Sequence, residues 1–385
     1  MRVALVTTEF GDAIEGGAGV YASSLAHALT QQGIDLTVLG PSQQQETTQD
    51  GLVICPVAPG GSGLVKFWFH LPMVYRRAVR SGTFEVIHGN GIAAVPLLLG
   101  HRRTAHVTTV HHVTRDLIRP GGRGAVSRLR DLRGETGIVP IAESVLVHKS
   151  DFLIADSRAT SDSLLRHYPS ARGKVGVIHL GVPIHHADIE PRAGLEMRQR
   201  WVHPDESLLL AVGRLEPRKG LDVLFKAIAA LSDSTPPFRL VVVGAGPIDA
   251  YQSLAAQLGC ADRVRLVGWL ASQDLAAAYQ ACDIFVMPSR HEGFGLAAME
   301  AMAAGKPVVV TRTGAALDGI IDDSCGAVVE PGNVEALTRA LRFLLSDPSA
   351  AGIGARNRAR LGQLSWEATA TATISAYERA LRARG

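Results

Sequence analysis

Two glutamates lie close together in the second half of the chain, and their type and spacing could hold a sugar. Glu292 and Glu300 are separated by seven residues in the segment 288–307, which reads PSRHEGFGLAAMEAMAAGKP. A carboxylate repels phosphate but accepts hydrogen bonds from hydroxyl groups, such as those of a sugar or a ribose. Either glutamate alone is also compatible with an ordinary solvated side chain on a protein surface.

The residues around this pair predict a strand, a tight loop and a helix. The apolar run 282–287 is typical of a buried parallel strand, and strong helix formers fill the stretch from Gly295 to the glycine at 305. Glu292 is therefore expected in the loop and Glu300 about two turns into the helix. Because free N–H groups at a helix start bind anions, four residues are expected to meet a substrate: Gly293, Phe294, Gly295 and Leu296.

Two cations stand in a second polar string, GRLEPRKG at 213–220, directly after the apolar run 208–212. Arg214 offers a planar fork of donors and Lys219 a compact point charge, and both suit phosphate oxygens. An arginine and a lysine at this spacing carry little information by themselves. They gain weight because the two glutamates follow in the same half of the chain.

Together the two strings resemble the G-R-x4-K-G and E-x7-E elements of the retaining glycosyltransferases of family 4, the glycosyl transferases group 1. The resemblance covers nearly the whole chain, with its specific motifs concentrated in 208–315. It implies the GT-B fold, an α/β architecture of two Rossmann-like parallel-sheet domains facing across a cleft. The acceptor-side domain is expected over 1–186, with a closing helix at 366–385 crossing back onto it, and the nucleotide-sugar-binding domain over 187–365.

The resemblance implies a role for each charged residue of the second half. Glu300 would hold the ribose hydroxyls of the donor, and Glu292 the sugar hydroxyls. Arg214 and Lys219, beside Gly213, would bind the diphosphate, whose negative charge grows as it leaves. The family retains the anomeric configuration. Since no protein nucleophile is evident, we expect front-face (SNi-like) attack assisted by the departing phosphate.

Three shorter motifs add further substrate contacts through the resemblance. The string TTVH, which ends at His111, is similar to an element whose histidine reaches the donor sugar near its C6 hydroxyl and shapes the reaction pocket. Gly16 and Gly17 lie in a glycine-rich loop that by itself fits a tight turn or a phosphate contact equally well; the resemblance implies contact with the donor diphosphate and the acceptor. The main chain at Gly268 and Trp269 is expected beside the nucleotide base.

The first half alternates apolar runs with helical periodicity, which predicts a parallel sheet covered on both faces. Polar residues follow three of the runs, at 88–90, 111–112 and 156–157, and ligands bind such sheets at the carboxyl ends of the strands. The predicted strands are 3–7, 36–39, 84–88, 107–110, 152–155 and 175–179, with a helix over 20–30.

The second half repeats this alternation. The polar stretch 185–206 is interpreted as the linker between the domains. The string GAGPID at 244–249 is not a dinucleotide fingerprint, because aspartate replaces the third glycine. The predicted strands are 208–212, 239–243, 264–267, 282–287 and 308–311, with helices over 334–345 and from 365 onward.

Composition excludes several classes of protein. The 385 residues include 46% hydrophobic and 19% charged ones, and a net charge of +3 does not indicate nucleic-acid binding. The four cysteines and the adjacent histidines at 111–112 and 185–186 lack metal-ligand spacing, and no D-x-D motif appears, so we expect neither a metal nor a cofactor. With no signal peptide and no apolar run near ~20 residues, a cytoplasmic protein is expected.

Two basic stretches allow more than one interpretation. Residues 66–80 interleave aromatic with basic side chains, and 115–133 carry six arginines around a Pro-Gly-Gly loop. They fit a partly buried helix and a surface loop, contact with an anionic acceptor, or a weak peripheral hold on the inner membrane face.

We therefore expect a hexosyltransferase that moves a sugar from a nucleoside-diphosphate donor to a hydroxyl acceptor, which could be a small molecule, a glycan or a lipid-linked sugar. One alternative is a sugar-nucleotide epimerase or hydrolase that shares the donor site. A second is a non-catalytic sugar-nucleotide-binding partner subunit, against which the intact set of Arg214, Lys219, Glu292 and Glu300 argues.

Overall fold

The computed structural model divides the chain into two compact units. The described residues are 1–11, 14, 16–41, 47–49, 52–58, 63–98, 104–117, 138–182, 191–231, 235–347 and 351–384. The first unit combines Met1–Gly181 with Trp366–Gly385, and the second is Val182–Ser365. The boundary expected after residue 186 falls outside the described residues and stays a prediction.

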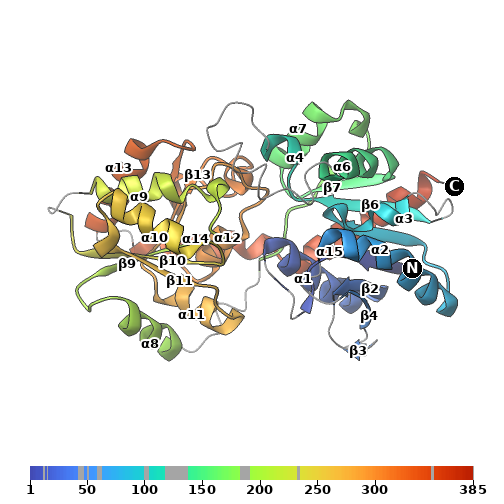
Figure 1. Cartoon of the computed structure of the whole chain (residues 1–385), viewed down its shortest axis with the longest axis horizontal. Coiled ribbons are helices and arrows are strands. Elements are labelled where there is room, and N and C mark those ends of the chain that lie inside the picture. Colours follow the sequence, from blue (N-terminus) through green and yellow to red (C-terminus); the bar gives the residue numbers. More distant parts are fainter. Residues whose placement is uncertain are drawn as a thin grey trace. The chain divides into compact units, whose positions relative to one another are not determined.

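An eight-stranded sheet forms the centre of the first unit (Figure 1). Its apolar strands are covered on both faces; residues 3–6, for example, have no exposed surface. All neighbouring strands are parallel except β3 and β4, which form an antiparallel pair at one edge. In spatial order the strands are β3 (Thr47–Gln49), β4 (Leu52–Ala58), β2 (Asp35–Pro41), β1 (Arg2–Val6), β5 (Val86–Asn90), β6 (Ala105–Val110), β7 (Phe152–Ala155) and β8 (Val175–Val177).

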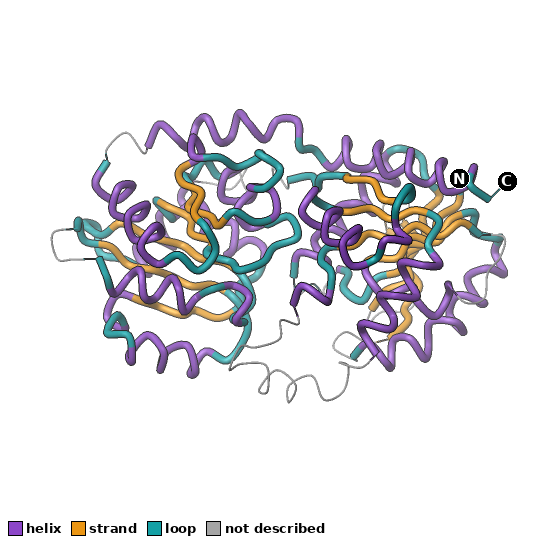
Figure 2. The backbone as a smooth tube through the Cα atoms, turned by 90° about the horizontal axis from the view of Figure 1, so that it is seen from above, coloured by secondary structure: helices purple, strands orange, loops and turns teal. Residues whose placement is uncertain are grey.

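Helices surround this sheet, and the C-terminal helix is one of them (Figure 2). Helix α1 follows the extended residue Gly16 and ends before Gly33, whose φ of 80° favours glycine. Helix α15 packs against α1, β6 and β7. The helices of this unit are α1 (Gly17–Gln31), α2 (Leu64–Ala78), α3 (Val95–Leu98), α4 (Thr114–Leu117), α6 (Ile138–Lys149), α7 (Arg158–His167) and α15 (Trp366–Arg382).

The second unit contains a six-stranded sheet in which every neighbouring pair is parallel. Its spatial order is that of a Rossmann sheet, and the order reverses between β9 and β12, where such sheets bind ligands. The strands in spatial order are β11 (Val264–Gly268), β10 (Phe238–Val243), β9 (Ser207–Val212), β12 (Ile284–Met287), β13 (Val308–Thr311) and β14 (Gly326–Val329).

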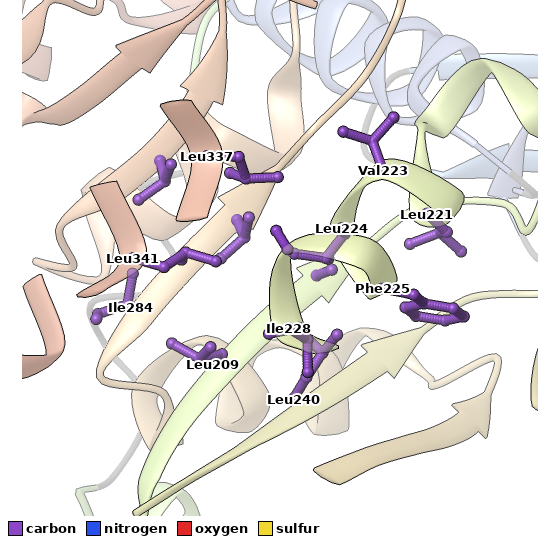
Figure 3. Close-up of a cluster of buried hydrophobic side chains, with 14 of the residues drawn as sticks. Leu209, Leu221, Val223, Leu224, Phe225, Ile228, Leu240, Ile284, Leu337 and Leu341 are labelled. Atoms are coloured by element: carbon purple, nitrogen blue, oxygen red, sulfur yellow. The ribbon is translucent and has the colours of Figure 1, made fainter. Parts of the chain in front are cut away.

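One hydrophobic cluster holds helices to this second sheet (Figure 3). Leu224 and Ile228 of α9 and Leu341 of α13 are fully buried and lie over Leu209 and Leu240 of the strands. This burial removes apolar surface from water and fixes the strand ends that carry the site. The helices are α8 (Pro191–Trp201), α9 (Leu221–Ala229), α10 (Ile248–Gln257), α11 (Ser272–Ala281), α12 (Leu296–Ala303), α13 (Val334–Ser346) and α14 (Ala351–Arg360).

The α/β fold with two Rossmann-like sheets, expected from the sequence, is confirmed. One helix and one pair of strands were not expected. The stretch 185–206, interpreted as a linker, contains helix α8, which packs on α11 and is held by a hydrogen bond from Arg198 to the carbonyl of Ala281. The hairpin of β3 and β4 was also missed, since Pro56 obscures the apolar pattern of β4.

None of the helices in the described part of the chain combines the length and the apolar character needed to cross a membrane. The basic stretch 66–80 lies mostly in α2, which buries Phe67, Leu71 and Tyr75 and exposes Phe69. The second basic stretch, 115–133, lies largely outside the described residues. Contact of either stretch with an acceptor or a membrane stays a prediction.

Candidate functional site

Two loops meet at the point where the strand order of the second unit reverses. One follows β9 and contains residues 213–220; the other follows β12 and contains residues 288–295. The main-chain N–H of Arg290 donates to the carbonyl of Arg218 at 2.8 Å, and a Cβ added to Gly220 would collide with the carbonyl oxygen of Pro288. A small pocket between the loops is lined by Gly213, Lys219, Val286, Met287, Pro288 and Ser289, among others.

Glu292 lies at the centre of these loops, where its carboxylate is paired with two cations. Its Oε1 accepts from Nζ of Lys219 at 2.7 Å and from the hydroxyl of Ser289 at 2.6 Å, and its Oε2 faces Nη1 of Arg218 at 3.4 Å. Burial alone would raise the pKa of Glu292, but Lys219 and Arg218 outweigh it and lower the pKa to about 2. The carboxylate is therefore ionised at any pH near neutral.

Arginines missed by the sequence interpretation stiffen the two loops. Arg218 also donates to the carbonyl of His291 and, through Nε and Nη2, to the carboxylate of Glu216. Arg290 forms a bidentate pair with Asp222, with distances of 2.7 and 2.6 Å, and donates to the carbonyl of Pro217. Only the position of Arg218 beside Lys219 could have hinted at its role.

Arg214 differs from Lys219, although both come from the same motif. Its side chain is exposed, and among the described residues its guanidinium makes no hydrogen bond or ion pair. Gly213 beside it has a φ of 149°, and a Cβ there would lie 3.1 Å from Cε of Lys219. In this loop the Lys219 side chain therefore contacts Glu292, whereas the Arg214 side chain is exposed to solvent.

The helix start expected to bind an anion is present. Gly295 precedes α12 with a φ of 94°, a conformation that favours glycine. The carbonyl of Phe294 accepts the N–H of Ala315 at 2.9 Å, which holds this turn to the loop after β13. The side chains of Phe294 and Leu296 are buried, so only their main chain can face a ligand.

Glu300 lies nearer to this helix start than the sequence suggested. It is the fifth residue of α12, about one turn from its beginning rather than two. Its side chain is only 7% exposed, and its Oε2 accepts from the hydroxyl of the buried Tyr279 at 2.6 Å. No sequence motif indicated that Tyr279 would be the partner.

Gly268 and Trp269 lie at the end of β11, an edge strand of the second sheet. The carbonyl of Gly268 accepts the N–H of Gly244 at 2.8 Å, and Gly268 has a φ of 76°. The Trp269 side chain is 62% exposed. The expectation that this main chain meets a base stays a prediction.

A second polar cluster lies in the first unit, at the carboxyl ends of β5, β6 and β7. His111 there contacts Oδ1 of Asn90 through Nε2 at 2.8 Å and Oδ2 of Asp156 through Nδ1 at 3.2 Å. Asn90 is oriented by the carbonyl of Ala18, which can only accept from its Nδ2, at 2.9 Å. Both ring nitrogens of His111 therefore face acceptor oxygens.

A network of buried hydroxyl groups and one further histidine lies beside His111. Tyr377 of α15, His88 and Thr109 are joined by hydrogen bonds of 2.7 and 2.8 Å, and Thr109 contacts the hydroxyl of Tyr21 at 2.6 Å. The ring of Tyr21 meets that of His111 edge to face at 4.9 Å. Burial first, and then the nearby His111, lower the pKa of His88 to about 3, so His88 is neutral.

The glycine loop of the first unit joins the same cluster. The N–H of Gly16 donates to the carboxylate of Glu9 at 3.0 Å, and α1 begins at Gly17. The bond from Asn90 to Ala18 connects this loop to His111. His112 has an exposed side chain. The described residues contain no group of three or more His, Cys, Asp or Glu side chains arranged to hold a metal ion.

The sequence matches two family models. Residues 15–186 match Glycosyltransferase Family 4, and residues 195–363 match Glycosyl transferases group 1. A D-inositol 3-phosphate glycosyltransferase of Streptomyces avermitilis is 36% identical over 256 residues, which are 63% of this chain and 55% of that protein. The chain thus spans little more than half of that relative. A protein of the same name from Kineococcus radiotolerans is 29% identical over 97% of this chain and 92% of its own.

The fold also has relatives among solved structures. Sucrose-phosphate synthase from Thermosynechococcus elongatus superposes with a TM-score of 0.80 at 24% identity, covering 98% of each chain. At that identity the likeness concerns the fold alone. Each unit has its own polar cluster at the ends of parallel strands, and the two family models together span both units. These matches show that this chain belongs to the family 4 glycosyltransferases, the glycosyl transferases group 1.

Proposed function

We propose that this chain transfers a hexose-type sugar from a nucleoside-diphosphate donor to a hydroxyl acceptor, with retention of the anomeric configuration and without a metal ion. The observation that carries the proposal is the contact between Lys219 and Glu292 at 2.7 Å, where a Rossmann sheet binds its ligand. A cation for phosphate and a carboxylate for hydroxyls stand there side by side, as the two ends of a sugar diphosphate require.

The donor's diphosphate is assigned to Lys219, Arg214 and the N–H groups of the turn before α12. Arg214 supports this role because its guanidinium has no ion-pair partner among the described residues and is available to an anion. Gly295 lets the main chain approach the phosphate closely, because no Cβ stands in the way. Glu300 takes the ribose hydroxyls in this proposal.

Donor binding would change the partner of Lys219. Without a ligand, the ammonium group of Lys219 is neutralised by Glu292. A diphosphate carries more negative charge than a carboxylate, so it competes for the ammonium group and for Arg218. Glu292 then becomes available to accept hydrogen bonds from the sugar hydroxyls.

The proposed reaction is a front-face displacement. The bond between the anomeric carbon and the diphosphate oxygen breaks, and the acceptor oxygen forms its bond on the same face. The acceptor proton passes to the departing phosphate oxygen. Fixed cations at 214 and 219 stabilise the charge that collects on the leaving group.

The first unit supplies the acceptor side in this proposal. His111, held between Asn90 and Asp156, can exchange one of these hydrogen bonds for one to a substrate oxygen, and the Gly16–Gly17 loop offers main-chain N–H groups. Because the relatives carry the name D-inositol 3-phosphate glycosyltransferase, a phosphorylated polyol is a suitable first acceptor to test.

The proposal is tested by release of nucleoside diphosphate. The full chain is incubated with UDP-, GDP- and ADP-sugars, with and without a panel of polyol, polyol-phosphate and glycan acceptors, and products are identified by mass spectrometry. We expect diphosphate release only when an acceptor is present, and an added hexose on that acceptor. Release without an acceptor would indicate a hydrolase, and a changed sugar on an intact nucleotide an epimerase.

A further inference from the structure

Tyr279 contacts Glu300 from inside the core of the second unit. Its hydroxyl donates to Oε2 of Glu300 at 2.6 Å. The Tyr279 side chain has no exposed surface, and its ring lies against Phe285 of β12 with the ring centroids 5.8 Å apart. The phenol is therefore held in place by packing and brings a single polar atom to the carboxylate.

The direction of this hydrogen bond is fixed. Burial, followed by the charge of Glu300, raises the pKa of Tyr279 well above its ordinary value of 10.0. The phenol therefore keeps its hydrogen and donates it to Oε2 of Glu300. Short O–H···O⁻ bonds are among the stronger hydrogen bonds in proteins. Turning the carboxylate away from its present orientation would break this bond.

We propose that Tyr279 is a positioning residue that orients Glu300 in advance for the hydroxyl groups of a nucleotide ribose. The inference rests on the proposed function, which gives Glu300 that role. A glutamate side chain has three torsions, and ordering them costs free energy unless they are ordered before the ligand arrives. Tyr279 orders them in the free protein, so its hydroxyl should affect only ligands that carry ribose hydroxyls.

The first experiment measures nucleotide binding to the full chain by calorimetry. Titration with UDP, GDP and ADP identifies the diphosphate that binds most tightly, and its 2′,3′-dideoxy counterpart is then titrated. We expect Tyr279→Phe to weaken the ribonucleotide about tenfold, the scale of one hydrogen bond to a charged group. Binding of the dideoxy nucleotide should be unchanged. Tyr75→Phe, which removes a buried phenol hydroxyl in the first unit, should alter neither.

A double-mutant cycle provides a second test in case the Tyr279→Phe variant folds poorly. Tyr279→Phe removes one hydrogen-bond donor from the Glu300 carboxylate, whereas Glu300→Ala removes the carboxylate itself and leaves no acceptor for the Tyr279 hydroxyl. In the Glu300→Ala background, adding Tyr279→Phe should not weaken binding of the ribonucleotide further, because Tyr279 acts through the side chain at position 300. A further loss in the double variant would overturn the proposal.

The remaining outcomes separate this inference from the proposed function. If the wild-type chain binds none of the three diphosphates, the proposed function fails and the role of Tyr279 with it. If the ribose and dideoxy nucleotides bind equally to the wild type, the diphosphate site stands but the positioning role is refuted. Equal weakening of both nucleotides by Tyr279→Phe would indicate a general structural effect and would also refute it.

Discussion

At the scale of single residues, the carboxylate of Glu292 determines the charge of the site in the second unit. It is 7% exposed, yet it carries a full negative charge because Lys219 and Arg218 stand within 2.7 and 3.4 Å. A buried ion pair is held by its mutual attraction, and removal of one member leaves the other uncompensated. Arg214, in contrast, has a solvent-exposed charge. Substitution of Lys219 and substitution of Arg214 should therefore differ in their effects on stability, although both residues belong to one motif.

Arg214→Ala should lower turnover at least ~100-fold, the scale for one fixed charge beside a leaving group. Because its exposed guanidinium makes no hydrogen bond or ion pair among the described residues, the variant should fold with an unchanged melting temperature. The measurement is steady-state transfer to an acceptor, with donor binding followed separately.

Arg312→Ala is the matched control for that measurement, since Arg312 is an arginine of the same unit that is paired with Glu330 at 2.7 Å. It should retain normal turnover. Near-normal turnover in Arg214→Ala would contradict the diphosphate role of Arg214.

Glu292→Gln should reveal how much stability the ionised carboxylate contributes. The folded pKa of about 2 lies below the ordinary 4.5, so this contribution is present above pH 4.5 and is lost as the pH falls through 2. Between pH 5 and pH 3 the unfolding free energy of the wild type should fall by about 2 kcal/mol more than that of the variant. Urea unfolding at both pH values measures this difference.

Other carboxylates titrate alike in the two proteins, so their effects cancel in the comparison. Parallel losses of stability in the wild type and Glu292→Gln would show that Lys219 and Arg218 do not hold the carboxylate ionised.

At the scale of elements, the loops after β9 and β12 act as one piece. Arg290 connects its loop to Pro217, Arg218 and Asp222, and Gly220 lets the two main chains approach where no Cβ would fit. Gly220 also has a φ of 69°, so both its conformation and its surroundings demand glycine.

Gly220→Ala should therefore disturb the site more than an equivalent change elsewhere. Gly259 has nearly the same φ, 72°, but a Cβ there would meet nothing within 4 Å. Gly259→Ala should cost about 1–2 kcal/mol from its backbone conformation alone. Gly220→Ala should cost at least about 2 kcal/mol more, because it also forces the loops apart.

The two glycine variants are compared by urea unfolding and by nucleoside-diphosphate binding. Only Gly220→Ala should weaken binding. Equal effects of the two substitutions would show that the close approach of the loops contributes nothing to the site.

The sequence predicted these elements well where burial alone decides the structure. The strands are short apolar runs covered on both faces, which can be recognised without knowing their partners. The predicted strands 208–212 and 282–287, for example, correspond to Ser207–Val212 and Ile284–Met287 in the structure. Helix α8 was missed because few of its residues are apolar. Its packing on α11, which the sequence pattern does not show, stabilises it. Arg218 and Tyr279 could not be found from spacing, since tertiary folding brings them to Glu292 and Glu300 from distant positions in the sequence.

At the scale of the whole molecule, the residues with predicted roles fall into two sets. Arg214, Lys219, Glu292 and Glu300 belong to the second unit, and His111 with the glycine loop belongs to the first. Both sets could be placed from the sequence because each follows the carboxyl ends of predicted parallel strands, where ligands bind such sheets. It could not supply the buried bonds of His88 and Tyr377, which lie 289 positions apart.

The distribution of charge supports the proposed independence from a metal ion. Residues 213–219 and 291–292 hold three permanent cations, at 214, 218 and 219, and two carboxylates, at 216 and 292. In the proposed reaction, side chains of this site would neutralise the diphosphate, a task that a bound divalent ion can also perform. Chelation of divalent ions should therefore leave turnover unchanged. The measurement is transfer rate before and after exhaustive treatment with EDTA, with Mg²⁺ and Mn²⁺ added back. A complete loss of activity that either ion restores would mean that Arg214, Arg218 and Lys219 do not suffice to stabilise the leaving group.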